Sequence, residues 1–277
     1  MNFRKFYTNS LYILVAASVF ACGTPVDQDD PGTLGDDPSS GSQIKKNDQI
    51  QKIFSSIPSQ TETTEMLENA GARYNAKALN PIENVSKYST NKAKALNLGI
   101  YGIDLGVTNI FDQTQESVLY LKCTNQMAKS LGISGAFDEN MSARLDANSD
   151  NKDSLLAIIT DSYRTADSHL QENGQPGIST LMVVGAWIEG MYIASQIATE
   201  TKNEAIINRI GKEKTNLNDL IGLLESYKTE NQGTEEVIES LSAVKAVFDT
   251  TTDDKLTPEQ FKQIADKISE IRTKIIL

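Results

Sequence analysis

Two stretches of sequence decide the fold: ALNLGIYGIDLGV over residues 95–107 and ISTLMVVGAWIEGMYIA over residues 178–194. Each is apolar around almost its whole circumference when it is drawn as a helix, which is typical of a helix covered by protein on every side. Glycine weakens a helix by about 1 kcal/mol relative to alanine. The two stretches nevertheless contain Gly99, Gly102, Gly106, Gly185 and Gly190. Close approach of two backbones would offset this cost, so we predict that the two helices contact each other in the core.

Apolar residues recur at helical spacing on both sides of these stretches, from about residue 48 to the C-terminus. The last helix shows the pattern best, with an apolar residue every three or four positions from Phe261 to Ile275. The sequence Thr257-Pro258-Glu259-Gln260 marks its start with a capping box and a proline in the first turn. No stretch shows the sustained apolar–polar alternation of a strand. We therefore predict an all-α fold for residues 48–277, a single antiparallel multi-helix array or bundle with the two Gly-rich helices at its centre.

The expected helices are separated where the apolar periodicity stops or where turn residues gather. Met66, Ala70 and Tyr74 share one face, so we expect a helix that runs through them and ends at Asn80-Pro81. A single stripe over residues 206–227 predicts one helix there. The breaks are expected near residues 58, 81, 90, 113, 133, 150, 174, 202, 231 and 252.

The N-terminus carries a basic start, MNFRK, followed by the short apolar run Leu11–Ala21. This order indicates a signal peptide over residues 1–21, because the run is too short for the about 20 residues of a membrane-spanning helix. Val19-Phe20-Ala21-Cys22 resembles the lipobox of bacterial lipoproteins, with Phe20 standing where that motif has a small residue. The resemblance implies cleavage before Cys22 and a lipid on its thiol. An ordinary secretory peptide with a chance cysteine, or a plain N-terminal anchor, is the alternative.

Residues 22–47 contain almost no side chain that could join a core, and we predict that they form a flexible acidic tether. The cluster Asp27, Asp29 and Asp30 resembles the export signal that sends Bacteroidetes lipoproteins to the outer face of the outer membrane. The resemblance implies a surface-exposed lipoprotein that is attached to the membrane by its N-terminal lipid. A solvated spacer without further meaning is the alternative.

Composition narrows the function classes. The formal net charge is −11, and removal of residues 1–21, with their two basic and no acidic side chains, makes it more negative. Nucleic-acid binding is therefore disfavoured. With Cys22 acylated, Cys123 is the only thiol, so no intramolecular disulfide can form. Cys123 lies in an apolar-rich run, which predicts a buried inert thiol.

Residues 178–198 could also be considered as a membrane span, since they contain a single charge. That charge, Glu189, lies near the middle, where it opposes insertion by about 2.5 to 3.5 kcal/mol. Neither flank is basic. We expect a core helix.

Asp104 and Glu189 are the candidate chemical residues because each interrupts an apolar helix, and a buried carboxylate needs partners or must become neutral. Tyr101 and Tyr192 lie three residues away from them, on the same helical faces. The four side chains could form a general acid–base pair or a small polar ligand site. The alternative is a hydrogen-bonded network that sets helix register, or acids that cap helix N-termini.

Metal and cofactor motifs are not found. A ferritin-like site needs Glu-x-x-His on two helices, and the only histidine, His169, lacks that glutamate and is expected on the surface at a helix end. The stretches 146–150 and 249–257 resemble the start of calcium loops but lack the glycine and the bidentate glutamate. We interpret both as turns, with weak calcium binding as the alternative. No cofactor is expected.

The order of lipobox, acidic tether and a helical domain containing LNLGIYGIDL (96–105) and GAWIEGMY (185–192) resembles uncharacterised helical lipoproteins of Bacteroidetes. The resemblance covers most of the mature chain and implies no activity. Imelysin-like envelope proteins share a His-x-x-Glu pair, but His169 and Glu172 lack its glycine-rich context. We expect a membrane-anchored envelope lipoprotein that binds a protein or a small ligand. The alternative is an envelope enzyme using Asp104 and Glu189, which would require these carboxylates beside a solvent-reachable pocket.

Overall fold

The computed structural model describes residues 66–277 apart from residues 138, 149–150 and 230–232. The expected signal peptide (1–21), tether (22–47) and first helix (48–58) lie outside the described residues. Within the described part the chain is helical, without a strand, and has one isolated bridge between Thr252 and Lys255. The all-α prediction is confirmed.

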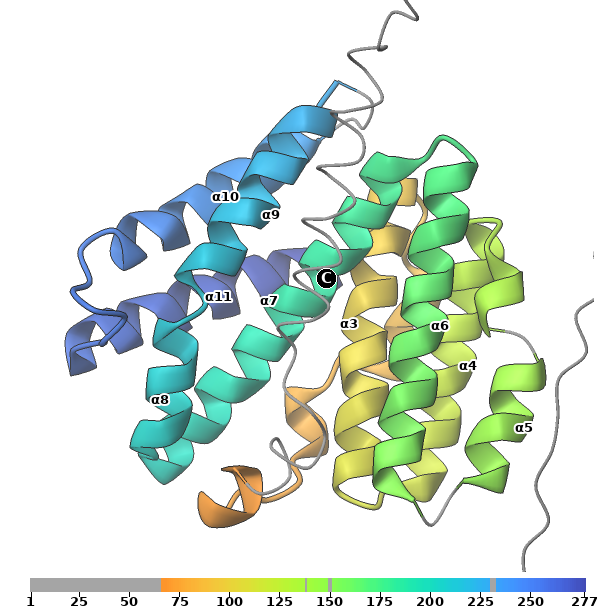
Figure 1. The fold of residues 1–277 in the computed structure, drawn as a ribbon, viewed down its shortest axis with the longest axis horizontal. Coiled ribbons are helices and arrows are strands. Elements are labelled where there is room, and N and C mark those ends of the chain that lie inside the picture. The colour runs from red at the N-terminus through yellow and green to blue at the C-terminus, as the bar shows by residue number, and fades with distance from the viewer. Residues whose placement is uncertain (1–65, 138, 149–150, 230–232) are drawn as a thin grey trace, which may run out of the picture.

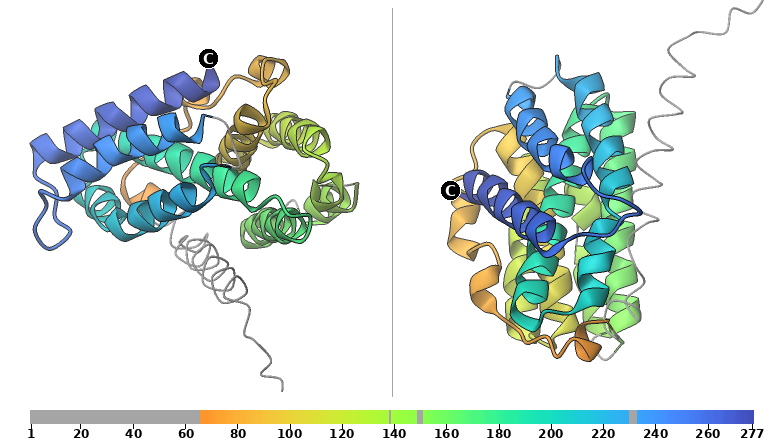
Figure 2. Two further views of the ribbon diagram at one scale, coloured as in Figure 1. Left: turned by 90° about the horizontal axis from the view of Figure 1, so that it is seen from above. Right: turned by 90° about the vertical axis from the view of Figure 1, so that its left-hand side faces the viewer.

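The longest helix, α7, runs through the middle of the molecule (Figure 1). The α-helices after residue 90 are α3 (Asn91–Ile110), α4 (Thr114–Ser130), α5 (Glu139–Ala147), α6 (Lys152–Glu172), α7 (Pro176–Thr201), α8 (Glu204–Gly211), α9 (Lys214–Tyr227), α10 (Thr234–Phe248) and α11 (Pro258–Ile276). Helices α3 to α6 lie on one side of α7 and α8 to α11 on the other, with α10 and α11 side by side (Figure 2). The short 3₁₀ turns are η1 (Ala76–Ala78), η2 (Ile82–Ser86) and η3 (Ser134–Phe137).

Helices α3 and α7 cross in direct contact at Gly99 and Gly185. A Cβ on Gly99 would lie 2.0 Å from the carbonyl oxygen of Met182, and a Cβ on Gly185 would lie 2.0 Å from that of Leu96. Only glycine allows the two backbones to come this close. The predicted contact between the two Gly-rich helices is confirmed.

The other three glycines of these helices do not lie at the crossing. Gly102 faces α6, where an added Cβ would lie 2.1 Å from the Tyr163 hydroxyl. A Cβ on Gly106 would make an ordinary 3.6 Å contact with Leu156, and one on Gly190 would meet no atom within 4 Å. Close contact between α3 and α7 therefore accounts for Gly99 and Gly185 but not for these three glycines.

The helix expected to run through Tyr74 ends early. Residues 66–69 are helical, and the chain then turns through Gly71, which has φ +66°. Glycine in this left-handed conformation is a common end to a helix. The segment up to Asn80-Pro81 contains η1 instead of a continuous helix, so the shared face of the sequence was misleading here.

The single helix expected over residues 206–227 is two helices, α8 and α9, with a break at residues 212–213. Gly211 packs against the α10–α11 connection, where an added Cβ would lie 2.0 Å from the carbonyl oxygen of Asp254. Both helices bury their apolar faces in the same core, with Ile210 and Leu217 buried on either side of the break. The apolar stripe therefore continues although the helix does not.

The predictions for α11 are confirmed. Ile264 and Ile268 are fully buried. The capping box is formed, because the Gln260 N–H donates to Thr257 Oγ1 at 3.2 Å and the Thr257 N–H donates to Gln260 Oε1 at 2.9 Å. This end of the fold is specified locally by its own sequence.

Among the described helices, α7 is the one long and apolar enough to cross a membrane. However, 72% of its most apolar window is buried inside the protein. This burial among the other helices agrees with the expectation that α7 is a core helix.

Candidate functional site: a sealed carboxylate pair and an apolar groove

Asp104 of α3 and Glu189 of α7 are both 0% exposed. Arg272 of α11 pairs with Glu189 through two bonds, from Nε to Oε2 at 2.7 Å and from Nη2 to Oε1 at 2.8 Å. This bidentate geometry is the strongest form of a charge-assisted hydrogen bond. The ion pair joins the C-terminal helix to the centre of the molecule.

Arg272 was missed by the sequence analysis. It lies four residues after Ile268, on the buried face of α11, and a charged residue on such a face signals a buried partner. Its Nη2 also donates to the carbonyl oxygen of Ala78 at 2.8 Å, and its guanidinium lies 4.1 Å from the ring centroid of Tyr192. Tyr192 therefore reaches the predicted cluster, but as a cation–π partner of the arginine.

Asp104 has fewer hydrogen bonds than Glu189 to offset the cost of burying its carboxyl group. Its Oδ2 accepts the backbone N–H of Asn80 at 3.1 Å, while its Oδ1 is buried without a donor. Burial and then the nearby Glu189 charge raise the pKa of Asp104 well above its ordinary value. Burial also raises the pKa of Glu189, but there Arg272 opposes the rise. Of the two carboxyls, Asp104 is therefore the one whose neutral form is favoured, because Arg272 stabilises the charged form of Glu189 through two hydrogen bonds.

Tyr101 does not contact the carboxylates through its hydroxyl. The hydroxyl donates to the carbonyl oxygen of Pro81 at 3.1 Å, and the ring lies 6.3 Å from the ring of Tyr88 and 6.1 Å from that of Tyr120. Burial raises the pKa of Tyr101 further above its ordinary value. Of the four side chains predicted to cluster, Asp104, Glu189 and Tyr192 therefore lie around Arg272. Tyr101 packs beside them, against other aromatic rings.

The aromatic residues next to Tyr101 belong to a hydrogen-bonded network centred on Asn80. The Asn80 amide donates to Tyr88 and to Asn97, each at 3.0 Å, and Tyr120 donates to the Asn80 carbonyl oxygen at 3.1 Å. Asn97 and Asn84 bind the last carbonyl groups of α11, those of Ile275 and Ile276. These contacts hold helices together, which is the role that the register-setting alternative describes.

The carboxylate cluster has no route to solvent along the groove described below, because neither Asp104 nor Glu189 lines it. Both side chains are enclosed. The geometry therefore gives no support to an acid–base reaction at this pair, which needs a reachable substrate.

The remaining predicted residues lie apart from this cluster. Cys123 is 5% exposed and burial raises its pKa to about 11, which fits an inert thiol. His169 is exposed near the end of α6. In the described part of the chain, no group of three or more His, Cys, Asp or Glu side chains could hold a metal ion.

The stretch 249–257, which resembles a calcium loop, gives no ligand cluster among the described residues. Asp249 is paired with Lys245 and Lys214 at 2.5 and 3.5 Å. The stretch 146–150 lies partly outside the described residues.

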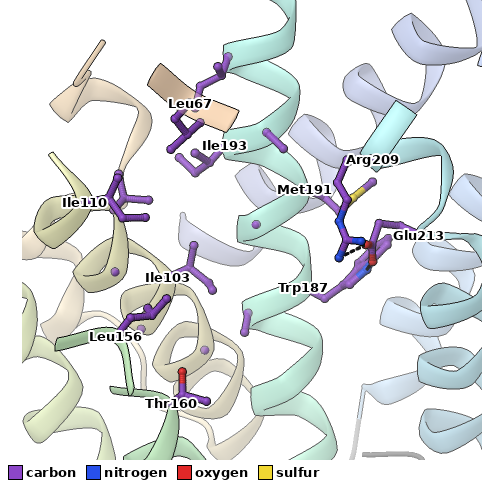
Figure 3. A pocket seen from close by; sticks show the side chains of 18 of the residues that line it. Leu67, Ile103, Ile110, Leu156, Thr160, Trp187, Met191, Ile193, Arg209 and Glu213 are labelled. Atoms are coloured by element: carbon purple, nitrogen blue, oxygen red, sulfur yellow. Dashed lines mark hydrogen bonds and ion pairs between the residues drawn. The ribbon is translucent and has the colours of Figure 1, made fainter. Parts of the chain in front are cut away.

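A groove of about 310 Å³ runs along one face of α7 (Figure 3). Its floor is a run of small and apolar residues spaced three or four apart on that helix, namely Val183, Ala186, Gly190, Ala194 and Ile197. One wall comes from α3 and α6, through residues such as Ile103 and Leu156, and the other from α8 and α9. Met66 and Leu67 border it as well.

Gly106 and Gly190 find their explanation here. Both line the groove, and a side chain on Gly190 would project into open space. The sequence signal for the groove was present as glycines on helix faces, but it was interpreted only as helix contact. Glycine here keeps space open.

The polar groups of the groove are few, and those on the side of α7, α8 and α9 are paired with one another. Glu213 accepts the indole N–H of Trp187 at 3.1 Å and the Asn216 amide at 2.8 Å, and Arg209 lies 3.6 Å from its other oxygen. On the opposite side Thr160 directs its hydroxyl towards the groove (Figure 3). Such a site favours an apolar molecule with at most a small polar group.

The comparisons with known proteins add no relative. The sequence matches no protein-family model, and no curated protein and no solved structure matches it.

Proposed function

We propose that this protein is a lipid-anchored envelope lipoprotein that binds a small, uncharged apolar ligand in the groove along α7. The observation that carries the proposal is the groove itself, whose floor is apolar and whose glycines leave it open. The enclosed carboxylates leave the acid–base alternative without a reachable site.

The size of the groove supports a ligand of limited length. Small-molecule sites begin at about 300 Å³, and the groove measures about 310 Å³. A dry apolar cavity of about 150 Å³ binds benzene. The groove would therefore hold about two aromatic rings or a medium-length acyl chain, and burial of its surface supplies about 25 cal/mol per Å².

The N-terminal features support the location of the protein. The lipobox-like residues 19–22 and the cluster Asp27, Asp29 and Asp30 fit a lipoprotein on the outer face of a Bacteroidetes outer membrane. A ligand site held by a tether on a membrane would capture apolar molecules at the cell surface.

The test uses Trp187, the only tryptophan in the chain, which lines the groove. The mature chain carrying Cys22→Ser is titrated with N-phenyl-1-naphthylamine, an uncharged apolar dye. We expect saturable binding of one dye per chain, with energy transfer from Trp187. Binding without energy transfer, or no binding, would contradict the proposal.

A matched pair of glycine variants locates the site. Gly190→Leu fills the groove, whereas Gly222→Leu places the same side chain on an exposed position of α9. Both changes favour the helix by up to about 1 kcal/mol. Gly190→Leu should weaken dye binding at least tenfold and Gly222→Leu should leave it unchanged. Equal affinity of both variants would place the dye elsewhere.

A further inference from the structure

The polar and apolar side chains of the groove lie in different halves. Among the lining residues, the side chains with a nitrogen or oxygen atom are Thr160, Tyr163, Trp187, Arg209, Glu213 and Asn216. Thr160 and Trp187 lie in the lower half of the view in Figure 3, whereas Leu67 and Ile193 lie at the upper end. Glu213 is hydrogen-bonded to Trp187, so the ion pair that it forms with Arg209 also lies near Trp187. The groove therefore has a polar half around Trp187 and an apolar half towards the C-terminal end of α7.

The apolar half has the length of a medium alkyl chain. From Trp187 to Ile197, both of which line the groove, α7 rises by about 15 Å, at about 1.5 Å per residue. An extended alkyl chain advances by about 1.3 Å per carbon, because its C–C bonds of about 1.5 Å form a zigzag, so about ten to twelve carbons match this length. The volume of about 310 Å³ is near the lower limit for small-molecule sites. A long but small groove favours one chain over a branched or polycyclic molecule.

The charges of the polar half favour a neutral head group. Arg209 and Glu213 are the charged side chains among the lining residues, and they are paired with each other at 3.6 Å. A carboxylate head would lie near Glu213 and would compete with it for Arg209. An ammonium head would likewise compete with Arg209 for Glu213. Placing a charge in an apolar site without a partner of its own is costly, so an uncharged head fits this half best.

The hydroxyl of Thr160 is the polar group that can meet such a head. On the same helix, α6, the hydroxyls of Ser162 and Thr165 donate to the carbonyl oxygens four residues before them, at 2.9 and 2.8 Å. The Thr160 hydroxyl makes no hydrogen bond to any of the residues that the structure describes, and it points into the groove (Figure 3). A threonine hydroxyl can both donate and accept. A ligand hydroxyl beside it would therefore gain a partner for either role.

We propose that the ligand is a linear alkyl or acyl chain with an uncharged, hydroxyl-bearing head, bound with the head at Thr160 and the tail along α7 towards Ile197. This proposal rests on the groove being the ligand site of the proposed function. Thr160 would select the head, and the length of the apolar half would select the chain. Fatty alcohols and monoacylglycerols share this chemistry.

The head group is tested by isothermal titration calorimetry of the mature chain carrying Cys22→Ser at pH 8. We expect 1-decanol to bind at least tenfold more tightly than decanoate. Thr160→Val keeps the shape of the side chain and should weaken 1-decanol about three- to tenfold, the effect of one lost hydrogen bond. Thr165→Val, at an exposed position of α6, should leave the affinity unchanged. Equal affinity for the two head groups, or for 1-decanol in all three proteins, would overturn the proposal.

The dye of the proposed function separates a role in head recognition from a structural one. N-phenyl-1-naphthylamine has no hydroxyl, so its affinity should be the same in the parent, Thr160→Val and Thr165→Val. A loss of dye and 1-decanol affinity to the same extent in Thr160→Val would show that Thr160 only shapes the groove, and would overturn its role in selecting the head.

The direction of the chain is tested by Ala194→Leu, which adds bulk to the groove floor in its apolar half. Position 194 lies about 10 Å beyond Trp187 along α7, at about 1.5 Å per residue. This change should weaken 1-decanol at least tenfold and leave the shorter 1-hexanol unchanged, with Gly222→Leu as the control that affects neither. If Ala194→Leu does not fold, Ala194→Val makes the same test. Equal loss of both alcohols, or loss of neither, would overturn the proposed direction.

The outcomes distinguish this proposal from the proposed function. If the dye binds but 1-decanol fails these tests, the groove is a ligand site for another class of molecule. If neither the dye nor 1-decanol binds, the proposed function is wrong as well. Tighter binding of 1-monodecanoylglycerol than of 1-decanol would assign the ligand to the monoacylglycerols, and the reverse order would assign it to the fatty alcohols.

Discussion

At the scale of single residues, Arg272 determines how the charges of the core are satisfied. It is the cation paired with Glu189 and it also binds a backbone carbonyl of Ala78. The sequence showed the two buried acids, because each interrupts an apolar run. It did not show which cation meets them, because Arg272 is 83 residues from Glu189 along the chain and only the packing of α11 against α7 brings the two together.

Replacement of Arg272 by Met should lower the free energy of unfolding by about 3 to 5 kcal/mol, since Glu189 would remain buried without its counter-ion. Urea denaturation followed by circular dichroism measures this. The control is Arg164→Met on the exposed surface of α6, which should change stability by less than about 0.5 kcal/mol. A loss of similar size in both variants would show that the pair has no special structural role.

The raised pKa of Asp104 gives a pH dependence with a definite sign. The folded protein holds this proton more tightly than the unfolded chain, whose pKa is near 3.8. The associated stability is therefore present below about pH 4 and is lost as the pH rises towards the folded pKa. Asp104→Asn keeps an oxygen for the Asn80 N–H and has no ionisable group, so it should flatten this decline. Melting temperatures from pH 4 to 8 test it, and identical profiles would refute it.

At the scale of elements, the sequence predicted best where one helix specifies itself. The capping box at Thr257 and the apolar stripe of α11 are local signals, and both are present in the structure. The failure at residues 206–227 came where segments distant in the sequence pack together. Gly211, the last residue of α8, lies against the backbone of Asp254 just before the break between α8 and α9, a contact that no pattern within residues 206–227 could reveal.

The crossing of α3 and α7 predicts a sharp difference between glycines. Gly99→Ala should destabilise the protein by about 1 to 3 kcal/mol or more, because its methyl group would overlap the Met182 carbonyl. Gly222→Ala should stabilise it by up to about 1 kcal/mol, since its position is open. Chemical denaturation of both variants provides the measurement. Two stabilising substitutions would mean that the helices do not cross at Gly99.

At the scale of the whole molecule, the groove was not foreseen although several of its residues were singled out. Each glycine was interpreted within its own pair of helices, whereas the groove needs α3, α6, α7, α8 and α9 together. The expected core role of α7 held for most of its surface, and its remaining face forms the groove floor. The apolar character of α7 thus serves two purposes, core packing and the proposed binding of a ligand.

Lipid anchoring predicts the behaviour of the entire chain in a cell. Cys22→Ser should give an uncleaved precursor that incorporates no labelled palmitate, because the lipoprotein proposal places the acyl chain on this thiol. Metabolic labelling and the apparent mass of the protein measure both effects, with Cys123→Ser as the matched control that should still mature. Normal cleavage and labelling of the Cys22 variant would refute the lipoprotein proposal.

The central claim is that the groove along α7 holds an apolar ligand, and native mass spectrometry of protein purified from its own envelope tests it most directly. We predict a non-covalent adduct of a single small apolar molecule on the parent and on Gly222→Leu, and none on Gly190→Leu. An adduct that persists in Gly190→Leu, or that is absent from all three proteins, would contradict the claim.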